Sequence, residues 1–129
     1  MTCSDILLAA CNLISEEAGD RIDNKDFTAR APYVIAAFCG MASLVDKHYR
    51  KAFSLGSQPL FNRARIELDA QFPLSDRFIP AAAAYLASML IAAYNPQLSR
   101  TLREDARESF TSAYDEIPAT IHGIIDRNR

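Results

Sequence analysis

The stretch that most constrains the fold of this chain is residues 81–94, AAAAYLASMLIAAY, in which Ser88 is the one polar residue. A helix that is apolar all round is normally central to a bundle, because each of its faces needs a neighbour. The stretch is shorter than the roughly 20 residues with which a helix spans a bilayer. We therefore expect a globular, helical protein built around this segment.

Composition and cysteine usage favour a soluble intracellular domain. The chain has 129 residues, 23% of them charged, which suits one globular domain and argues against disorder. Its formal net charge of -2 gives no overall attraction to nucleic acid or anionic lipid. Cys3, Cys11 and Cys39 are odd in number and lack CxxC spacing, which is typical of reduced thiols. No basic residue precedes the first apolar stretch, so we expect no secretory signal.

The first helix is expected over residues 4 to about 18. Thr2 and Asp5 have the spacing of a capping box, and Ser4 is the alternative cap. Gly19 is expected to end the helix. One face is apolar, with residues that recur at steps of three and four: Ile6, Leu7, Ala10, Leu13 and Ile14.

The second helix is expected over residues 28 to about 53, with Pro32 in its first turn, where a missing N–H does no harm. From residue 33 to 45 only Gly40 and Ser43 interrupt the apolar residues, so this half should be buried on several sides. The second half has an amphipathic pattern. Its charged side chains are expected to be exposed: Asp46, Lys47, Arg50 and Lys51.

Residues 56–74 support two interpretations equally. Ile66, Leu68, Ala70 and Phe72 alternate with polar residues, which is the period of a half-buried strand. The Arg, Ala, Glu and Leu content of the same segment favours a helix. Phe72 followed by proline ends either element.

The third helix should open near Ser75 or Asp76, with Pro80 close to its first turn. Asn95 followed by Pro96 marks a helix start, because Asn is a good N-cap and Pro suits the first helical position. The fourth helix then extends to about residue 114. The sequence thus predicts a mainly α fold, a small bundle of four principal helices with an irregular, possibly β, segment between the second and third. Residues 1–116 should form the domain and residues 117–129 a C-terminal tail.

No arrangement of residues predicts catalysis, a cofactor or a metal. His48 and His122 lie far apart, Cys39 has the setting of a small core residue, and the four glycines form no phosphate loop. A basic zone extends over residues 46–65, from the end of the second helix into the following segment, with Asp46 as its single acid. It could contact phosphates or a complementary protein face; a solvated helix end is the alternative. Its members are Lys47, Arg50, Lys51, Arg63 and Arg65.

The apolar helices favour self-association. In a small bundle each helix keeps one side exposed, so two helices that are apolar on several sides suggest extra burial, and subunit contact is its simplest source. The small side chains of the third helix would allow a second helix to approach closely. The alternative is that the third helix is the core helix of a monomer.

The order of these elements resembles the small head–tail connector or adaptor proteins of tailed bacteriophages and prophages. The similar features are a YLA-x-ML-like helix, an Asn-Pro turn with an L-S start, and a charged closing helix, LREDARESFTSAY. In this chain the first two are formed by Tyr85, Leu86, Ala87, Met89 and Leu90, then Asn95, Pro96, Leu98 and Ser99.

The resemblance implies a non-enzymatic structural protein, located in the virion neck or in the host cytoplasm during assembly. Copies would form a ring that joins the portal and tail proteins and continues the DNA channel without sequence-specific DNA binding. A tail that orders on assembly would fit this role. The candidate subunit-interface residues are Tyr33, Phe38, Ala84, Tyr85, Ala87, Tyr94, Ile121, Ile124 and Ile125.

Two other classes of function stay open. A helical interaction or regulatory module would form a two-fold dimer, with the third helix at the axis. A small-molecule binder or enzyme would need a buried polar cluster, and the expected inward faces offer few polar groups: Ser43, Ser88, Tyr85 and the cysteines.

Overall fold

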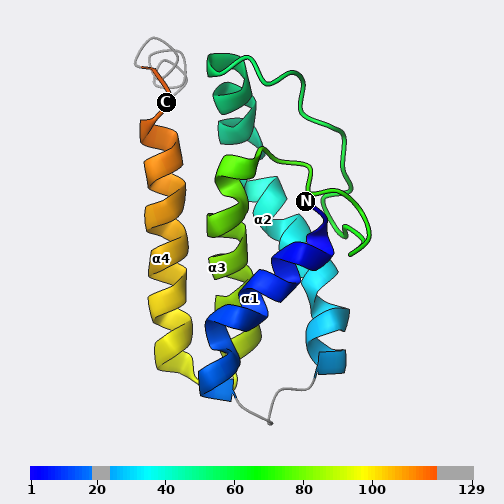
Figure 1. The fold of residues 1–129 in the computed structure, drawn as a ribbon, viewed down its shortest axis with the longest axis vertical. Helices are drawn as coiled ribbons and strands as arrows, with labels where there is room; N and C mark the ends of the chain where they lie inside the picture. The colour runs from blue at the N-terminus through cyan, green and yellow to red at the C-terminus, as the bar shows by residue number, and fades with distance from the viewer. Residues whose placement is uncertain (19–23, 119–129) are drawn as a thin grey trace.

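The computed structural model describes residues 1–18 and 24–118, and Figure 1 shows its four α-helices. They are α1 (Cys3–Ala18), α2 (Asn24–Ala52), α3 (Ile79–Ile91) and α4 (Pro96–Asp115), and the 3-10 turn η2 (Asp76–Phe78) leads into α3. This confirms the predicted mainly α bundle. Residues 56–74 contain neither helix nor strand, and an isolated antiparallel bridge between Thr2 and Gln71 is the one β contact in the described part of the chain.

The N-terminus of α1 is capped as the sequence predicts, with Thr2 rather than Ser4 as the cap. The Asp5 carboxylate accepts the Thr2 backbone N–H at 2.9 Å, and the Thr2 hydroxyl accepts the Asp5 N–H at 3.3 Å. The N–H groups of Cys3 and Ser4 donate to the carbonyls of Ala70 and Leu68, at 2.9 and 2.8 Å. A distant part of the chain therefore completes the capping of α1.

The predicted starts of the second and fourth helices differ in their outcome. Asn95 caps α4, since its side-chain oxygen accepts the Leu98 N–H at 3.0 Å and Pro96 takes the first position. Helix α2 begins earlier than expected, at Asn24, so Pro32 lies inside the helix rather than in its first turn. The carbonyl of Pro32 accepts the N–H of Ile66 at 3.1 Å, which joins α2 to the segment that follows it.

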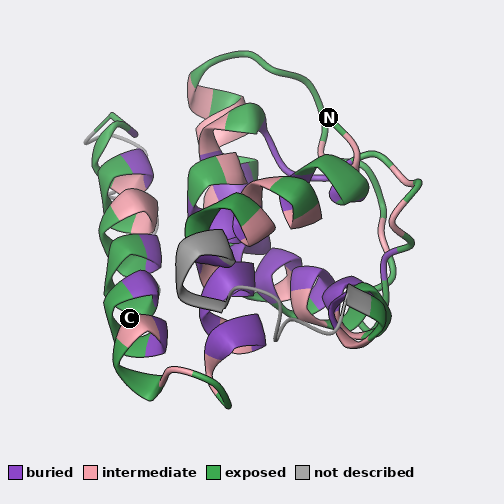
Figure 2. Cartoon of the chain, turned by 60° about the horizontal axis from the view of Figure 1, so that its bottom comes forward, coloured by how far each residue is buried: buried purple, intermediate pink, exposed green. Residues whose placement is uncertain are grey.

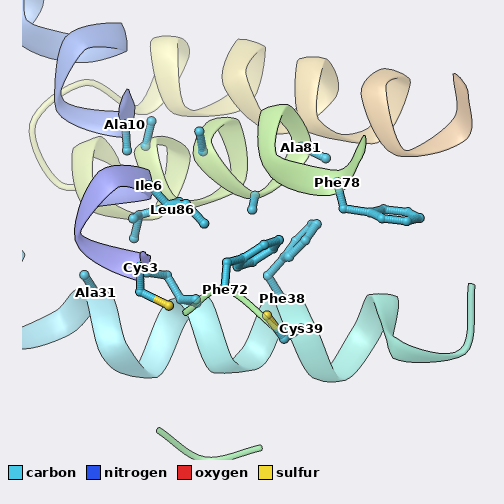
Figure 3. Packing of buried hydrophobic residues seen from close by; sticks show 14 of the residues in the cluster. Cys3, Ile6, Ala10, Ala31, Phe38, Cys39, Phe72, Phe78, Ala81 and Leu86 are labelled. Atoms are coloured by element: carbon cyan, nitrogen blue, oxygen red, sulfur yellow. The ribbon is translucent and has the colours of Figure 1, made fainter. Parts of the chain in front are cut away.

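Helix α3 is the centre of the bundle, and the chain's own elements cover it. It contacts α1, α2 and α4, and from residue 81 to 91 all residues are buried except the half-buried Tyr85 and Met89. Figure 3 shows side chains of α1, α2 and α3 meeting in one cluster, among them Ile6, Phe38 and Leu86. This corrects the expectation that a neighbouring copy is needed to cover α3.

Helix α4 packs on α3 through one face. Ser99 of α4 is buried, and its hydroxyl donates to the Ser88 carbonyl at 2.7 Å, so the two helices approach closely there. Figure 2 shows the buried positions of α4 on the side turned toward the bundle and exposed positions on the other side. The predicted amphipathic pattern of α4 is thus confirmed.

The chain remains packed on the bundle beyond the expected domain end at residue 116. Ile117, which the sequence places in the tail, is 2% exposed. Glu116 accepts from Arg77 Nε at 2.9 Å and from the Tyr49 hydroxyl at 3.4 Å. Partial burial and the Glu116 carboxylate raise the pKa of Tyr49. The domain therefore includes Ile117.

Candidate functional site

The long connection between α2 and η2, residues 53–75, is the most unusual part of this small fold. Loops longer than about 12–15 residues without secondary structure of their own are uncommon in compact domains and are usually functional. In Figure 1 this loop occupies one side of the molecule, and α4 lies on the other.

A buried carboxylate holds both ends of this loop. Asp46 of α2 is 0% exposed, and each of its oxygens accepts two hydrogen bonds. Oδ1 accepts the backbone N–H and the hydroxyl of Ser75, at 2.8 and 2.7 Å. Oδ2 accepts Arg50 Nε and Gln58 Nε2, both at 2.8 Å. A buried charge is tolerated when it is paired and its lone pairs are used, and Asp46 meets both conditions.

Ser43 extends this network by one turn of α2. Its hydroxyl donates to Gln58 Oε1 at 2.9 Å, and its carbonyl accepts Gln58 Nε2 at 3.0 Å. Arg63 Nη1 donates to the Gly40 carbonyl at 3.2 Å. Described buried side-chain polar atoms all have partners, so the polar layer between α2 and the loop is complete.

Two of the five residues of the predicted basic contact zone, Arg50 and Arg63, belong to this network. Arg50 is half-buried and also donates to the Pro73 carbonyl at 3.1 Å. Arg65 pairs with Glu67 at 2.7 Å and lies over the ring of Tyr33, 5.2 Å from its centroid. The expectation that Asp46 and Arg50 are exposed is therefore wrong, because the loop covers this face of α2.

Two members of the zone, Lys47 and Lys51, are exposed. They line an open hollow of about 510 Å³ at the end of α2, which the loop closes on one side with residues 54–58. Lysines at a helix C-terminus also complement the negative end of its dipole. Together with Arg63 and Arg65, which are also exposed, these two side chains are the part of the predicted zone that a partner can reach.

The loop presents apolar side chains to solvent. Helix α2 ends with Ser54 in the left-handed conformation (φ 55°), and the Leu55 N–H donates to the Arg50 carbonyl at 2.9 Å, a Schellman-type end. Gly56 follows with φ 84°. Phe53 and Leu55 are about half exposed beyond this turn, and Leu60 is 102% exposed. A leucine wholly in water contributes nothing to the stability of the single chain.

An apolar groove of about 330 Å³ lies between α2 and α4, with α3 as its floor. The rings of Phe38 and Tyr85 pack 5.9 Å apart inside it, and Met41, 63% exposed, forms one wall. Arg103 and Arg107 line it from α4, and within the described part of the chain neither guanidinium forms an ion pair. The remaining lining residues are Ala42, Ala106 and Phe110.

The predicted interface residues divide into three groups. Ala84 and Ala87 are 7% and 0% exposed inside the chain, which corrects the expectation that they face another copy. Phe38 and Tyr85 belong to the groove, whereas Tyr33 and Tyr94 are about half exposed elsewhere on the surface. The remaining three lie outside the described residues: Ile121, Ile124 and Ile125.

The cysteines are poorly suited to nucleophilic chemistry. Burial raises the pKa of Cys3 to about 11 and raises that of Cys39 further, and it also raises the pKa of the half-buried Cys11. Over the described residues, no three His, Cys, Asp or Glu side chains gather as a metal site would require. His122 lies outside this part of the chain, and His48 is half-buried on α2.

Among the described residues, one helix, Lys25–Ala52 of α2, is long and apolar enough to cross a membrane by length and composition, with a mean hydropathy of 1.3 over an 18-residue window. The core helix of a soluble protein passes the same test, and 44% of that window is buried inside the fold. The test alone is therefore weak evidence for a membrane span.

The sequence analysis missed Asp46, Gln58, Ser75 and Leu60 as site residues. One signal was present for Asp46, since Cys39, Ala42 and Asp46 follow one another at steps of three and four on the buried face of α2. An acid in register with a core face predicts a buried polar contact. No pattern in the neighbouring sequence predicts that the side chain of Leu60 is exposed.

Comparison with protein-family models, with curated proteins and with solved structures finds no match to this chain. The geometry of the loop and the groove, together with the resemblance to phage connector proteins, is therefore the basis for inferring a function.

Proposed function

We propose that this protein is a non-enzymatic structural adaptor of the phage head–tail junction, which oligomerises into a ring between portal and tail proteins and around passing DNA. The observation that supports this most is the loop of residues 53–75, which a buried carboxylate fixes in place while Leu60 stays wholly in solvent. A fixed loop has already lost much of the conformational freedom that binding would otherwise remove.

A ring needs a heterologous interface, in which two different patches of the subunit meet. The loop offers one apolar patch in Phe53, Leu55 and Leu60. The groove between α2 and α4 is a second, different patch, and the loop and α4 lie on opposite sides of the molecule (Figure 1). This placement suits head-to-tail contact between successive copies.

The helical dimeric module is the alternative, and one observation favours it. Ala37, Met41 and Leu44 form an exposed row on α2 at steps of four and three. Because α3 is buried, a two-fold dimer would have α2 at its axis rather than α3.

The test is native mass by light scattering over a wide range of protein concentrations, with negative-stain images of any large species. We expect closed rings, and we expect Leu60→Ser to abolish them without changing the urea midpoint of unfolding. Leu8→Ser is the matched control, because Leu8 is 64% exposed on α1. A discrete dimer that Met41→Glu dissociates would favour the alternative, and a monomer at every concentration would contradict self-assembly of the chain alone.

A further inference from the structure

We propose that the open hollow at the end of α2 binds the phosphate groups of a DNA backbone, with Lys47 and Lys51 as the residues that neutralise them. The hollow measures about 510 Å³ and is lined by the end of α2 and the first residues of the loop. It lies at one end of the bundle, at the top in Figure 1. The choice of DNA as the polyanion rests on the proposed function, whereas the anion site itself does not depend on ring formation.

The unbalanced charge of the hollow comes from the two lysines. Lys47 and Lys51 are exposed, and among the described residues neither ammonium has an ion-pair partner. Arg50 also lines the hollow, but the buried Asp46 pairs with its guanidinium and balances its charge. Lys47 and Lys51 are four residues apart on α2, where like charges repel each other, so an anion between them relieves this repulsion.

The turn after α2 adds neutral donors to the same hollow. Ser54 has φ 55° and Gly56 φ 84°, and turns of this kind expose backbone N–H groups that form concave anion sites. Within the described part of the chain, the N–H groups of Gly56 and Ser57 and the hydroxyls of Ser54 and Ser57 have no hydrogen-bond partner. All three residues line the hollow. An oxyanion there therefore accepts from neutral donors as well as from the lysines.

The negative end of the α2 dipole opposes an anion at this place, but its effect is small. The dipole acts within the last turn of a helix. The Arg50 carbonyl in that turn already accepts the Leu55 N–H at 2.9 Å. Each lysine carries its charge on a flexible four-carbon stem, beyond the helix end. A ligand at the mouth of the hollow therefore meets the ammonium groups before the carbonyls.

The lining of the hollow suits a phosphate backbone rather than a base. No aromatic and no acidic side chain is among the described residues that line it, so a base has no ring to stack on. The Gln58 amide, which could otherwise read a base edge, donates to the Ser43 carbonyl and to Asp46. Phosphate contacts need only cations and hydrogen-bond donors, and these carry no sequence information. The site therefore binds DNA without regard to sequence.

The spacing of the lysines fits two phosphates. Lys47 and Lys51 are about 6 Å apart along α2, at about 1.5 Å per residue, so each ammonium can contact a separate phosphate of one strand. A protein that neutralises Z phosphates loses affinity with salt at a slope of about -0.9Z in logarithmic units. Two lysine contacts therefore contribute about -1.8 to that slope, which makes the site measurable.

An NMR titration with a short duplex DNA of mixed sequence tests the site. The full chain is labelled with ¹⁵N and carries Leu60→Ser, which keeps it as single subunits and does not alter the lining of the hollow. We expect the Gly56 and Ser57 amide signals to shift saturably at low salt. Lys47→Gln combined with Lys51→Gln should weaken the apparent affinity at least about tenfold and flatten the salt slope by about 1.8. The urea midpoint of unfolding confirms that each variant stays folded.

Arg103→Gln combined with Arg107→Gln is the matched control. It removes two exposed positive charges at the same spacing on α4, and neither arginine lines the hollow. This pair should change the affinity by less than about twofold. Equal weakening by the two pairs would overturn the proposal, because attraction by the overall charge would then explain the binding. Unshifted Gly56 and Ser57 signals would also overturn it.

Inorganic phosphate separates a DNA backbone from a free phosphate ligand. Linked phosphates contact both lysines at once, so DNA should bind more tightly than inorganic phosphate at the same phosphate concentration. Equal affinities would overturn the assignment to DNA and would assign the hollow to a small phosphate ligand. Because the titration is read on single subunits, a chain that forms no rings contradicts the proposed function alone. Rings together with unshifted Gly56 and Ser57 signals would contradict this site alone.

Discussion

Two regions of this molecule are ordered by opposite means. Helix α3 is held by apolar side chains from α1, α2 and α4, and Leu86 and Leu90 within it are 0% exposed. The loop of residues 53–75 is held by a polar layer in which Asp46 joins Gln58 to Ser75. Ordering a backbone costs about 1–2 kcal/mol per residue, so the loop needs these bonds in addition to its buried Ile66, Phe72 and Leu74.

Because α3 and the loop are held in different ways, they leave different side chains exposed to solvent. Packing of α3 uses its apolar groups internally, so from residue 81 to 91 only Tyr85 and Met89 are partly accessible to a partner. The polar attachment of the loop uses backbone, amide and guanidinium groups, and this leaves Leu55 and Leu60 free to face solvent. Contact with another subunit is therefore better served by the loop than by α3, although the apolar sequence of α3 is the feature that suggests self-association.

Removing the carboxylate that fixes the loop should have the largest effect. Asp46→Ala leaves Arg50, Gln58 and Ser75 without their shared acceptor, and breaking such a buried pair costs about 3–5 kcal/mol. Urea denaturation measures the free energy of unfolding. Asp69→Ala in the same loop is the control, because Asp69 is exposed and its loss should change stability by less than about 0.5 kcal/mol. Equal free energies of unfolding for the two variants would show that Asp46 does not stabilise the loop.

Leu86 in the core and Leu60 in the loop should respond differently to the same substitution. Leu86→Ala opens a cavity in the centre of the bundle and should cost about 2–5 kcal/mol of unfolding free energy. Leu60→Ala removes a side chain that is wholly in water, so the same urea measurement should change by less than about 0.5 kcal/mol. A clear loss of stability in Leu60→Ala at low protein concentration would mean that this leucine packs within its own chain.

The smallest expected effect concerns Asp5, an exposed carboxylate in contrast to the buried Asp46. Hydrogen bonds from the Thr2 backbone N–H and hydroxyl hold the pKa of Asp5 below its ordinary value. A lowered pKa means that the stabilisation is complete above about pH 4 and is lost as pH falls through the folded-state pKa. Asp5→Asn should therefore unfold at lower urea than the parent chain at pH 7, and this difference should shrink in acid. An NMR titration of Asp5 with an ordinary midpoint would argue against the capping box.

Much of the fold could be predicted from local pattern. Steps of three and four among apolar residues locate the helices, Thr2 with Asp5 predicts the start of α1, and Asn95 with Pro96 predicts that of α4. These signals are readable because caps and amphipathic faces are formed by residues close in sequence. The start of α2 lies earlier than Pro32 indicates, because the helix continues on both sides of this proline.

The candidate site depends on contacts that no local pattern contains. Asp46 and Ser75 are 29 positions apart, and the groove combines Phe38, Tyr85 and Phe110 from three helices. The amino-acid pattern alone requires a helical bundle around residues 81–94, because apolar side chains must leave water wherever the chain places them. Which apolar groups are covered and which remain exposed depends on the packing of elements far apart in the sequence. That choice depends on where the loop and α4 lie against α2, and there hydrogen bonds to one buried carboxylate hold the loop.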